Sequence, residues 1–215
     1  MMTHVIKYKS IAVVSVGLWC VFIPVFAQQS DDPGKAAFDK AQMGEYEEAL
    51  KLYDIAISLN DKNANYFYYK GVCHFELHQY PEAIEVFTIA IGLHGRRADY
   101  FSNRGKAYLR TDKWEEAIED FNQSLKLDPL QSEFYYLRGT AKFRQGNHPA
   151  ALEDFHAAIE KDSRVGEYFL GRGECYLAMG ETERACEDFL QATHRHAFNA
   201  KFQYENNCLK NAAKP

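Results

Sequence analysis

The most constraining feature of this 215-residue chain is a strict 34-residue interval that no insertion interrupts. The interval separates four glycines, Gly71, Gly105, Gly139 and Gly173. It also separates five alanines, Ala49, Ala83, Ala117, Ala151 and Ala185, and five aromatic residues, Tyr53, Phe87, Phe121, Phe155 and Phe189. A unit of this length is one supersecondary element that cannot bury its apolar face alone, so neighbouring units must stack into a solenoid.

Each unit is predicted to fold as two helices, and the third unit, residues 98–131, shows this most clearly. Apolar and small residues recur at i, i+4 and i+7 in both halves of the unit, in the sets Phe101, Gly105, Tyr108 and Ala117, Phe121, Ser124. This spacing places each set on one helical face. The small residues let the two helices cross closely, and the ring of Phe121 fills the space beside the crossing. Pro129 ends the second helix because proline lacks the backbone N–H.

This order of Gly, Tyr, Ala, Phe and Pro on a 34-residue period resembles the tetratricopeptide repeat. Five units match. They begin near residues 30, 64, 98, 132 and 166 and make up residues 34–198. The first unit is atypical because Ala37 replaces the glycine, as is common at the end of a solenoid. The resemblance implies an all-α, right-handed superhelical solenoid of five antiparallel helix pairs.

Residues 199–215 are predicted to form a capping helix and a short tail. In this helix Phe202 and Leu209 are expected to face the last repeat, while Lys210 and Lys214 face solvent.

Residues 1–27 have the layout of a signal peptide, followed by a short linker over residues 28–33. Lys7 and Lys9 precede an apolar run of 17 residues, Ile11 to Ala27, and Ala27 offers a cleavage site. The chain is therefore expected to be exported to the periplasm or secreted. The alternative is an uncleaved membrane anchor, since the run reaches the lower limit for spanning a bilayer.

Charge excludes several function classes. Removal of the leader takes away two lysines and no acidic residue, which leaves a net charge of −7 (23 − 30). The charges of both signs are interspersed along the predicted helices, so nucleic-acid binding is not expected. The acidic balance also argues against adhesion to anionic lipid, and membrane association is expected only if the leader stays uncleaved.

Four cysteines follow the leader, Cys73, Cys175, Cys186 and Cys208, and none belongs to a CxxC motif. In an oxidising compartment Cys186 and Cys208 are the plausible pair, because one lies on the last repeat and the other on the helix predicted to cover it. Free buried thiols that behave as small apolar side chains are the alternative.

Catalytic and metal-binding motifs are weak in this sequence. No nucleophile elbow, phosphate-binding loop or pair of catalytic carboxylates is visible, so the chain is not expected to be an enzyme or to need a cofactor. His74 and His78 have the i, i+4 spacing of two metal ligands, but no third ligand accompanies them. His74 also takes the position that Tyr108 and Tyr176 occupy in other repeats, so metal handling is only a third hypothesis.

A basic residue precedes each helix-crossing glycine, in the series Lys70, Arg104, Arg138 and Arg172. The three repeats with arginine also carry an aspartate before the aromatic residue of the second helix, in the series Asp120, Asp154 and Asp188. The two features occur together, and a carboxylate matches the guanidinium fork. We therefore predict arginine–aspartate bridges between paired helices instead of a ligand site.

Tetratricopeptide arrays resemble one another in holding a peptide or a partner helix on the concave face, which the first helices line. In this chain that face is predicted to carry Tyr68, Val72, Ser102, Lys106, Tyr136, Thr140, Leu170 and Glu174, bordered by Asn103, Arg110 and Arg144. Lys106, Arg110 and Arg144 form a basic centre that could receive an acidic group; solvated surface charge is the alternative. Of the carboxylate-binding set of the co-chaperone members, only Asn103 is matched.

The sequence therefore predicts an exported scaffold that binds a partner protein or peptide on its concave face. The alternative is a membrane-tethered accessory subunit of an envelope complex that acts in assembly.

Overall fold

The computed structural model of the protein describes residues 32–209, which contain helices and no strand. The first helices of the five pairs are α1 (Pro33–Gln42), α3 (Ala64–Glu76), α5 (Ala98–Arg110), α7 (Ser132–Arg144) and α9 (Gly166–Ala178). The second helices are α2 (Tyr46–Leu59), α4 (Tyr80–Leu93), α6 (Trp114–Leu127), α8 (His148–Lys161) and α10 (Thr182–His194). A short helix, α11 (Ala200–Tyr204), runs into a π-helical turn, Glu205–Leu209.

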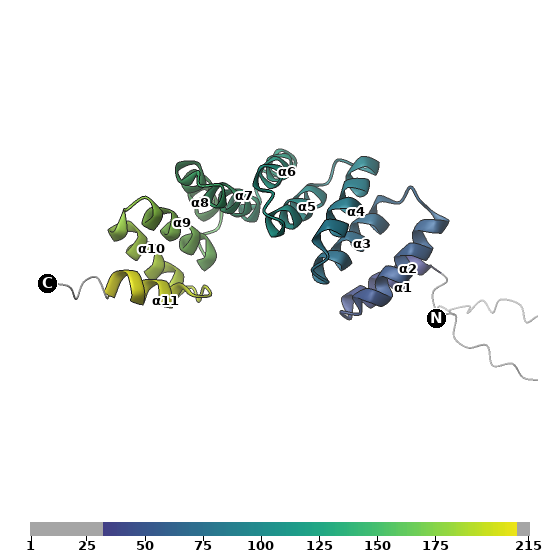
Figure 1. Cartoon of the computed structure of the whole chain (residues 1–215), viewed down its shortest axis with the longest axis horizontal. Coiled ribbons are helices and arrows are strands. Elements are labelled where there is room, and N and C mark those ends of the chain that lie inside the picture. The colour runs from purple at the N-terminus through teal and green to yellow at the C-terminus, as the bar shows by residue number, and fades with distance from the viewer. Residues whose placement is uncertain (1–31, 210–215) are drawn as a thin grey trace, which may run out of the picture. The chain divides into compact units, whose positions relative to one another are not determined.

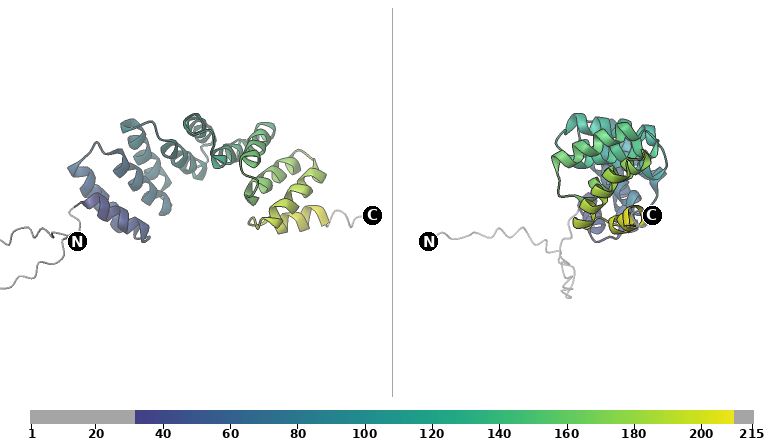
Figure 2. Two further views of the ribbon diagram at one scale, coloured as in Figure 1. Left: turned by 180° about the vertical axis from the view of Figure 1, so that it is seen from behind. Right: turned by 90° about the vertical axis from the view of Figure 1, so that its left-hand side faces the viewer.

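The helix pairs follow one another along the array in chain order (Figure 1). Each helix packs against the next, and consecutive odd-numbered helices also contact each other, from α1 and α3 through to α7 and α9. The even-numbered helices pack mainly on their odd-numbered neighbours, so the two series form two layers along residues 32–209 (Figure 2). The predicted all-α solenoid with a C-terminal helix is confirmed.

The helix crossings are built as the sequence pattern predicts. The five repeated alanines are completely buried, and the repeated aromatic rings are at most 2% exposed. A Cβ atom added at Gly71 would lie 2.7 Å from the Phe87 ring, and one at Gly105 would lie 2.9 Å from the Phe121 ring. Glycine therefore lets the aromatic side chain of the second helix reach the backbone of the first.

The turn inside each repeat depends on one residue in the left-handed backbone region. These residues also stand 34 positions apart and are Gly44, His78, Asp112, Gly146 and Gly180, with φ between 57° and 86°. Glycine adopts this conformation without a steric cost, and short polar side chains tolerate it better than most. His78 thus occupies a turn position, as the repeat alignment predicts.

The C-terminal helix is held to the last repeat by a disulfide between Cys186 of α10 and Cys208. Ala200, Tyr204 and Cys208 lie one turn apart on the side that packs against α10, and Ala200 is fully buried. The prediction that Phe202 and Leu209 face inward is wrong, since they are 62% and 52% exposed. The disulfide fixes the facing stripe at positions 200, 204 and 208, and Phe202 and Leu209 fall off it. Lys210 and Lys214 lie outside the described residues.

The other two cysteines of the described chain, Cys73 and Cys175, are free and fully buried. They occupy one repeat position together with Ala107 and Ala141, which are equally buried. Burial raises the pKa of the Cys73 thiol to about 11 and that of Cys175 to about 12. Both thiols therefore act as small core side chains.

The predicted leader, residues 1–27, lies outside the described residues. Within residues 32–209, no helix has the length and apolar character needed to cross a bilayer.

Candidate partner-binding face

The predicted binding residues occupy two parallel rows along four odd-numbered helices, α3, α5, α7 and α9. One row is Tyr68, Ser102, Tyr136 and Leu170, and the other is Val72, Lys106, Thr140 and Glu174. We call these two rows the inner face. Seven of the eight side chains are half-buried, but Ser102 is only 3% exposed and donates its hydroxyl hydrogen to the Asp99 carbonyl. Ser102 therefore offers no surface to a partner.

The first half of the inner face is held together by Tyr68. Its ring stacks on Tyr100 with 4.7 Å between centroids, and its Oη accepts a hydrogen bond of 2.9 Å from Asn103 Nδ2. Asn103 also donates to the Asp99 carbonyl. Because these contacts join α3 to α5, Asn103 acts mainly as a link between repeats.

The second half of the inner face has a similar aromatic link. The Tyr136 ring lies 5.9 Å from the Phe155 ring and 5.1 Å from the Tyr168 ring, measured between centroids. The Tyr168 hydroxyl group lies 3.0 Å from Ser132 Oγ, which joins α9 to α7. Burial raises the pKa of Tyr136, so this phenol is neutral over the physiological range.

The three predicted cations of the basic centre have different surroundings. Lys106 Nζ lies 2.7 Å from Glu133 Oε1, an ion pair between α5 and α7. Arg110 is exposed, and its guanidinium carbon lies 5.9 Å from the centre of the Tyr80 ring. Arg144 is also exposed. The pairing with Glu133 was missed in the sequence because the two residues stand 27 positions apart and meet only when the repeats stack.

An open pocket of about 390 Å³ lies at the C-terminal end of the inner face. It is lined by Phe143 and Arg144 of α7, Glu174, Leu177 and Ala178 of α9, and Gln203 of α11. Arg144 and Glu174 were predicted to lie on or beside the binding face, and the structure brings them to one pocket. Phe143 and Leu177 were missed, although their 34-residue separation places them at one repeat position.

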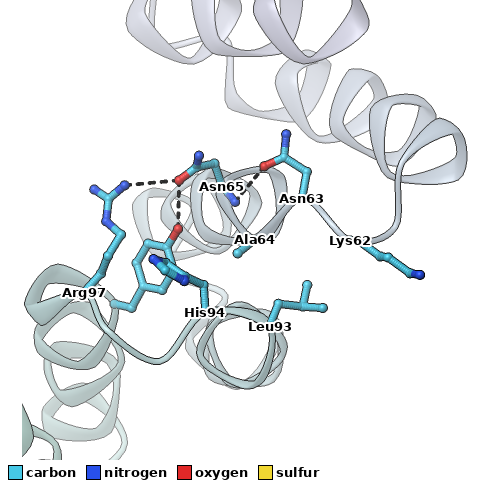
Figure 3. Close-up of a pocket in the computed structure, with 8 residues that line it drawn as sticks. Lys62, Asn63, Ala64, Asn65, Leu93, His94 and Arg97 are labelled. Atoms are coloured by element: carbon cyan, nitrogen blue, oxygen red, sulfur yellow. Dashed lines mark hydrogen bonds between the residues drawn. The ribbon is translucent and has the colours of Figure 1, made fainter.

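A second pocket, of about 340 Å³, lies where the turn after α2 meets the turn after α4 (Figure 3). Arg97 and Tyr100 both donate hydrogen bonds to Asn65 Oδ1, of 3.2 and 2.8 Å. The Arg97 guanidinium also binds Asp99 through two hydrogen bonds of 3.0 and 2.6 Å. These polar groups bind one another, so the pocket joins the second repeat to the third and offers few free groups to a ligand.

The predicted arginine–aspartate bridges are confirmed in all three repeats. Each arginine donates two hydrogen bonds of 2.6 to 2.9 Å to one carboxylate, in the pairs Arg104–Asp120, Arg138–Asp154 and Arg172–Asp188. Each aspartate is nearly buried. The second repeat differs, because Val86 stands where the last three repeats have aspartate, and Lys70 pairs with Asp54 of α2 instead. The bridged arginines are therefore structural and not free to bind a ligand.

A family model of the tetratricopeptide repeat matches residues 35–100, 102–154 and 136–200. The chain belongs to the tetratricopeptide repeat family.

Solved structures of tetratricopeptide proteins have the same fold. MamA from Desulfovibrio magneticus RS-1 is 18% identical, with a TM-score of 0.73 over 76% of this chain and 93% of that one. YrrB, described as a tetratricopeptide protein with an unusual peptide-binding site, is 23% identical, with a TM-score of 0.68 over 76% of this chain and 84% of that one. No match was found among curated proteins.

The two histidines considered as metal ligands make separate contacts within their tetratricopeptide repeat. His74 Nδ1 lies 2.7 Å from Gln79 Oε1, whereas His78 Nδ1 lies 2.9 Å from the Tyr80 hydroxyl oxygen. Among residues 32–209, no three His, Cys, Asp or Glu side chains are grouped so that they could hold a metal ion.

Proposed function

We propose that this protein is an exported, non-enzymatic scaffold whose inner face binds an extended or helical segment of a partner protein. The observation that carries the proposal is the continuity of this face over α3, α5, α7 and α9. These helices contact one another in series, and seven of the eight side chains in their inner rows are only half-buried. Tetratricopeptide proteins generally act as interaction scaffolds, and YrrB, which shares this fold, has a peptide-binding site.

The surface chemistry of the inner face suits a peptide. Tyr68, Tyr136 and Leu170 present half-buried apolar surface, while Arg110 and Arg144 add exposed positive charge beside it. A peptide contributes both apolar side chains and hydrogen-bonding groups, so such a mixed surface can bind it by packing and by charge-assisted hydrogen bonds.

Export is supported by the layout of residues 1–27 and by the disulfide between Cys186 and Cys208, because disulfides persist in oxidising compartments. The apolar run from Ile11 to Ala27 supports a second candidate, a membrane-tethered accessory subunit that acts in the assembly of an envelope complex. The mass of the mature protein, which shows where its N-terminus lies, distinguishes the exported scaffold from the tethered subunit. Cleavage after Ala27 supports the exported scaffold, and an intact leader supports the tethered subunit.

Selection of peptides from a random dodecamer phage library tests the binding face without knowledge of the partner. The affinity of selected peptides is measured by fluorescence anisotropy for the protein and for Thr140→Arg, which places a long cation in the middle of the inner face. We expect at least a tenfold loss of affinity for Thr140→Arg. Lys126→Ala, on exposed surface of α6, should change the affinity less than twofold.

Leu170→Arg serves as a second inner-face variant if Thr140→Arg alters folding, and thermal melting checks both variants. Selected peptides that bind well-folded Thr140→Arg and Leu170→Arg as tightly as the original protein would place the binding site elsewhere.

A further inference from the structure

Glu174 differs from the other members of its row on the inner face. In the same position of earlier repeats, Val72 is apolar, Lys106 pairs with Glu133, and Thr140 donates to the Tyr136 carbonyl. Among residues 32–209, the Glu174 carboxylate makes neither an ion pair nor a side-chain hydrogen bond, although the residue is half-buried. Burial raises the pKa of Glu174, and the nearby positive charge of Arg144 partly opposes this effect.

A partly buried carboxylate without a partner disfavours the folded state, because it loses hydration without gaining a compensating contact. The residues around it show what could compensate. Phe143, Leu177 and Ala178 line the same pocket with apolar surface, and the space of about 390 Å³ is large enough for a long side chain. The pocket therefore combines an apolar wall with one free acceptor.

We propose that this pocket takes a lysine or arginine side chain of the partner segment bound along the inner face. The methylene stem of such a residue packs on Phe143 and Leu177, and its cationic end donates charge-assisted hydrogen bonds to Glu174. Arg144 is exposed at the rim of the pocket. This inference rests on the proposed function and adds a charge requirement at one end of the bound segment.

Parallel peptide selections test the charge requirement. The random dodecamer library is selected on the protein and on Glu174→Lys. We expect lysine or arginine at one fixed position among peptides that bind the original protein, and no such preference among peptides that bind Glu174→Lys. An equal frequency of basic residues in the two sets would overturn the inference.

A double-substitution cycle then measures the contact directly. One selected peptide is compared with a version in which norleucine replaces the fixed lysine, since norleucine keeps the stem and removes the charge. Glu174→Gln should weaken binding of the lysine peptide about tenfold and leave binding of the norleucine peptide unchanged. Glu167→Gln, an exposed acid in the first turn of α9, is the matched control and should bind both peptides normally.

Melting temperatures separate a binding role from a structural one. Since the Glu174 carboxylate makes neither an ion pair nor a hydrogen bond within residues 32–209, and its burial outweighs the attraction of Arg144, Glu174→Gln should melt no lower than the original protein. If Thr140→Arg abolishes peptide binding but the cycle shows no coupling, the charge requirement is wrong and the inner-face function stands. If Thr140→Arg has no effect, the proposed function itself fails.

Discussion

Arg104 joins two consecutive repeats through a single guanidinium group. It binds both carboxylate oxygens of Asp120 on α6, at 2.8 and 2.7 Å, and its third nitrogen donates a 3.0 Å hydrogen bond to Thr88 on α4. Arg138 reaches Asn122 in the same manner, and Arg172 reaches His156. The arginine series is therefore a ladder that ties the third, fourth and fifth repeats each to the one before it.

Removing one partner of an arginine–aspartate bridge should lower the stability of the protein more than removing both partners. Asp120 is 2% exposed, so Arg104→Leu leaves a buried carboxylate without compensation and should lower the free energy of unfolding by about 2–4 kcal/mol. Adding Asp120→Val, which copies Val86 of the second repeat, should restore part of that loss. Urea unfolding monitored by circular dichroism measures the stability of the single and the double variant. A double variant no more stable than Arg104→Leu would contradict the pairing.

Glycine should be required at the helix crossings and dispensable at an open helical position such as Gly92. Gly71→Ala puts a Cβ atom 2.7 Å from the Phe87 ring and should destabilise the protein by about 1–3 kcal/mol through overpacking. Gly92 is exposed in α4 with no atom within 4 Å of an added Cβ, so Gly92→Ala should stabilise it by about 0.5–1 kcal/mol. Thermal melting should show shifts of opposite sign, and equal shifts would contradict the close approach.

The hydroxyl group of Tyr53 is expected to destabilise the folded protein. Tyr53 is fully buried in the position that the other repeats fill with phenylalanine, and its hydroxyl finds no hydrogen-bond partner in the described chain. An unsatisfied buried hydroxyl costs on the order of 1–3 kcal/mol, so Tyr53→Phe should raise the unfolding midpoint. Phe87→Tyr is the reciprocal change and should lower it. A lower midpoint for Tyr53→Phe would show that the hydroxyl is satisfied.

His156 should make stability depend on pH. Partial desolvation by the neighbouring side chains, followed by the positive charge of Arg172, lowers the pKa of His156 below its usual 6.5, although the residue stays partly open to solvent. The Arg172 guanidinium donates to Nδ1, so the neutral ring carries its hydrogen on Nε2, 3.2 Å from the Tyr176 hydroxyl oxygen. As the pH falls below about 6.5, His156 binds a proton more readily in the unfolded chain than in the folded chain. The free energy of unfolding therefore decreases.

His156→Asn, which copies Asn122 of the preceding ladder step, should therefore lose less stability than the original protein between about pH 7.5 and pH 5.5. Asn122→His is the reciprocal variant and should lose more. Denaturation midpoints across this range provide the measurement, and parallel pH profiles for all three proteins would show that His156 does not titrate in this way.

The repeat pattern predicted the helix pairs, the arginine–aspartate bridges and the choice of Cys186 and Cys208 as the possible disulfide pair. These features depend on residues in one repeat or in adjoining elements, where a fixed period also fixes the spatial relation. Gly71 and Phe87, for example, stand 16 residues apart in one helix pair, and each later repeat places its glycine and aromatic residue at the same distance in sequence.

Contacts that depend on how repeats stack were harder to predict. The pairing of Lys106 with Glu133 depends on how neighbouring odd-numbered helices stack, which the period alone does not specify, and the burial of Ser102 was likewise not predicted. The outward orientation of Phe202 and Leu209 follows from the attachment of the short C-terminal helix at Cys208. Glu174 was predicted as part of the inner face, but only the structure shows that its carboxylate has no ion pair or hydrogen bond within residues 32–209.

Site-specific photo-cross-linking tests whether the inner face holds the partner segment. A photoreactive amino acid is placed at Thr140 on the inner face or at Lys126 on α6, and each protein is irradiated with the same library-selected peptide. We expect a covalent adduct from position 140 and little or none from position 126. An adduct formed mainly from position 126, with both proteins folded and bound to the peptide, would contradict this expectation.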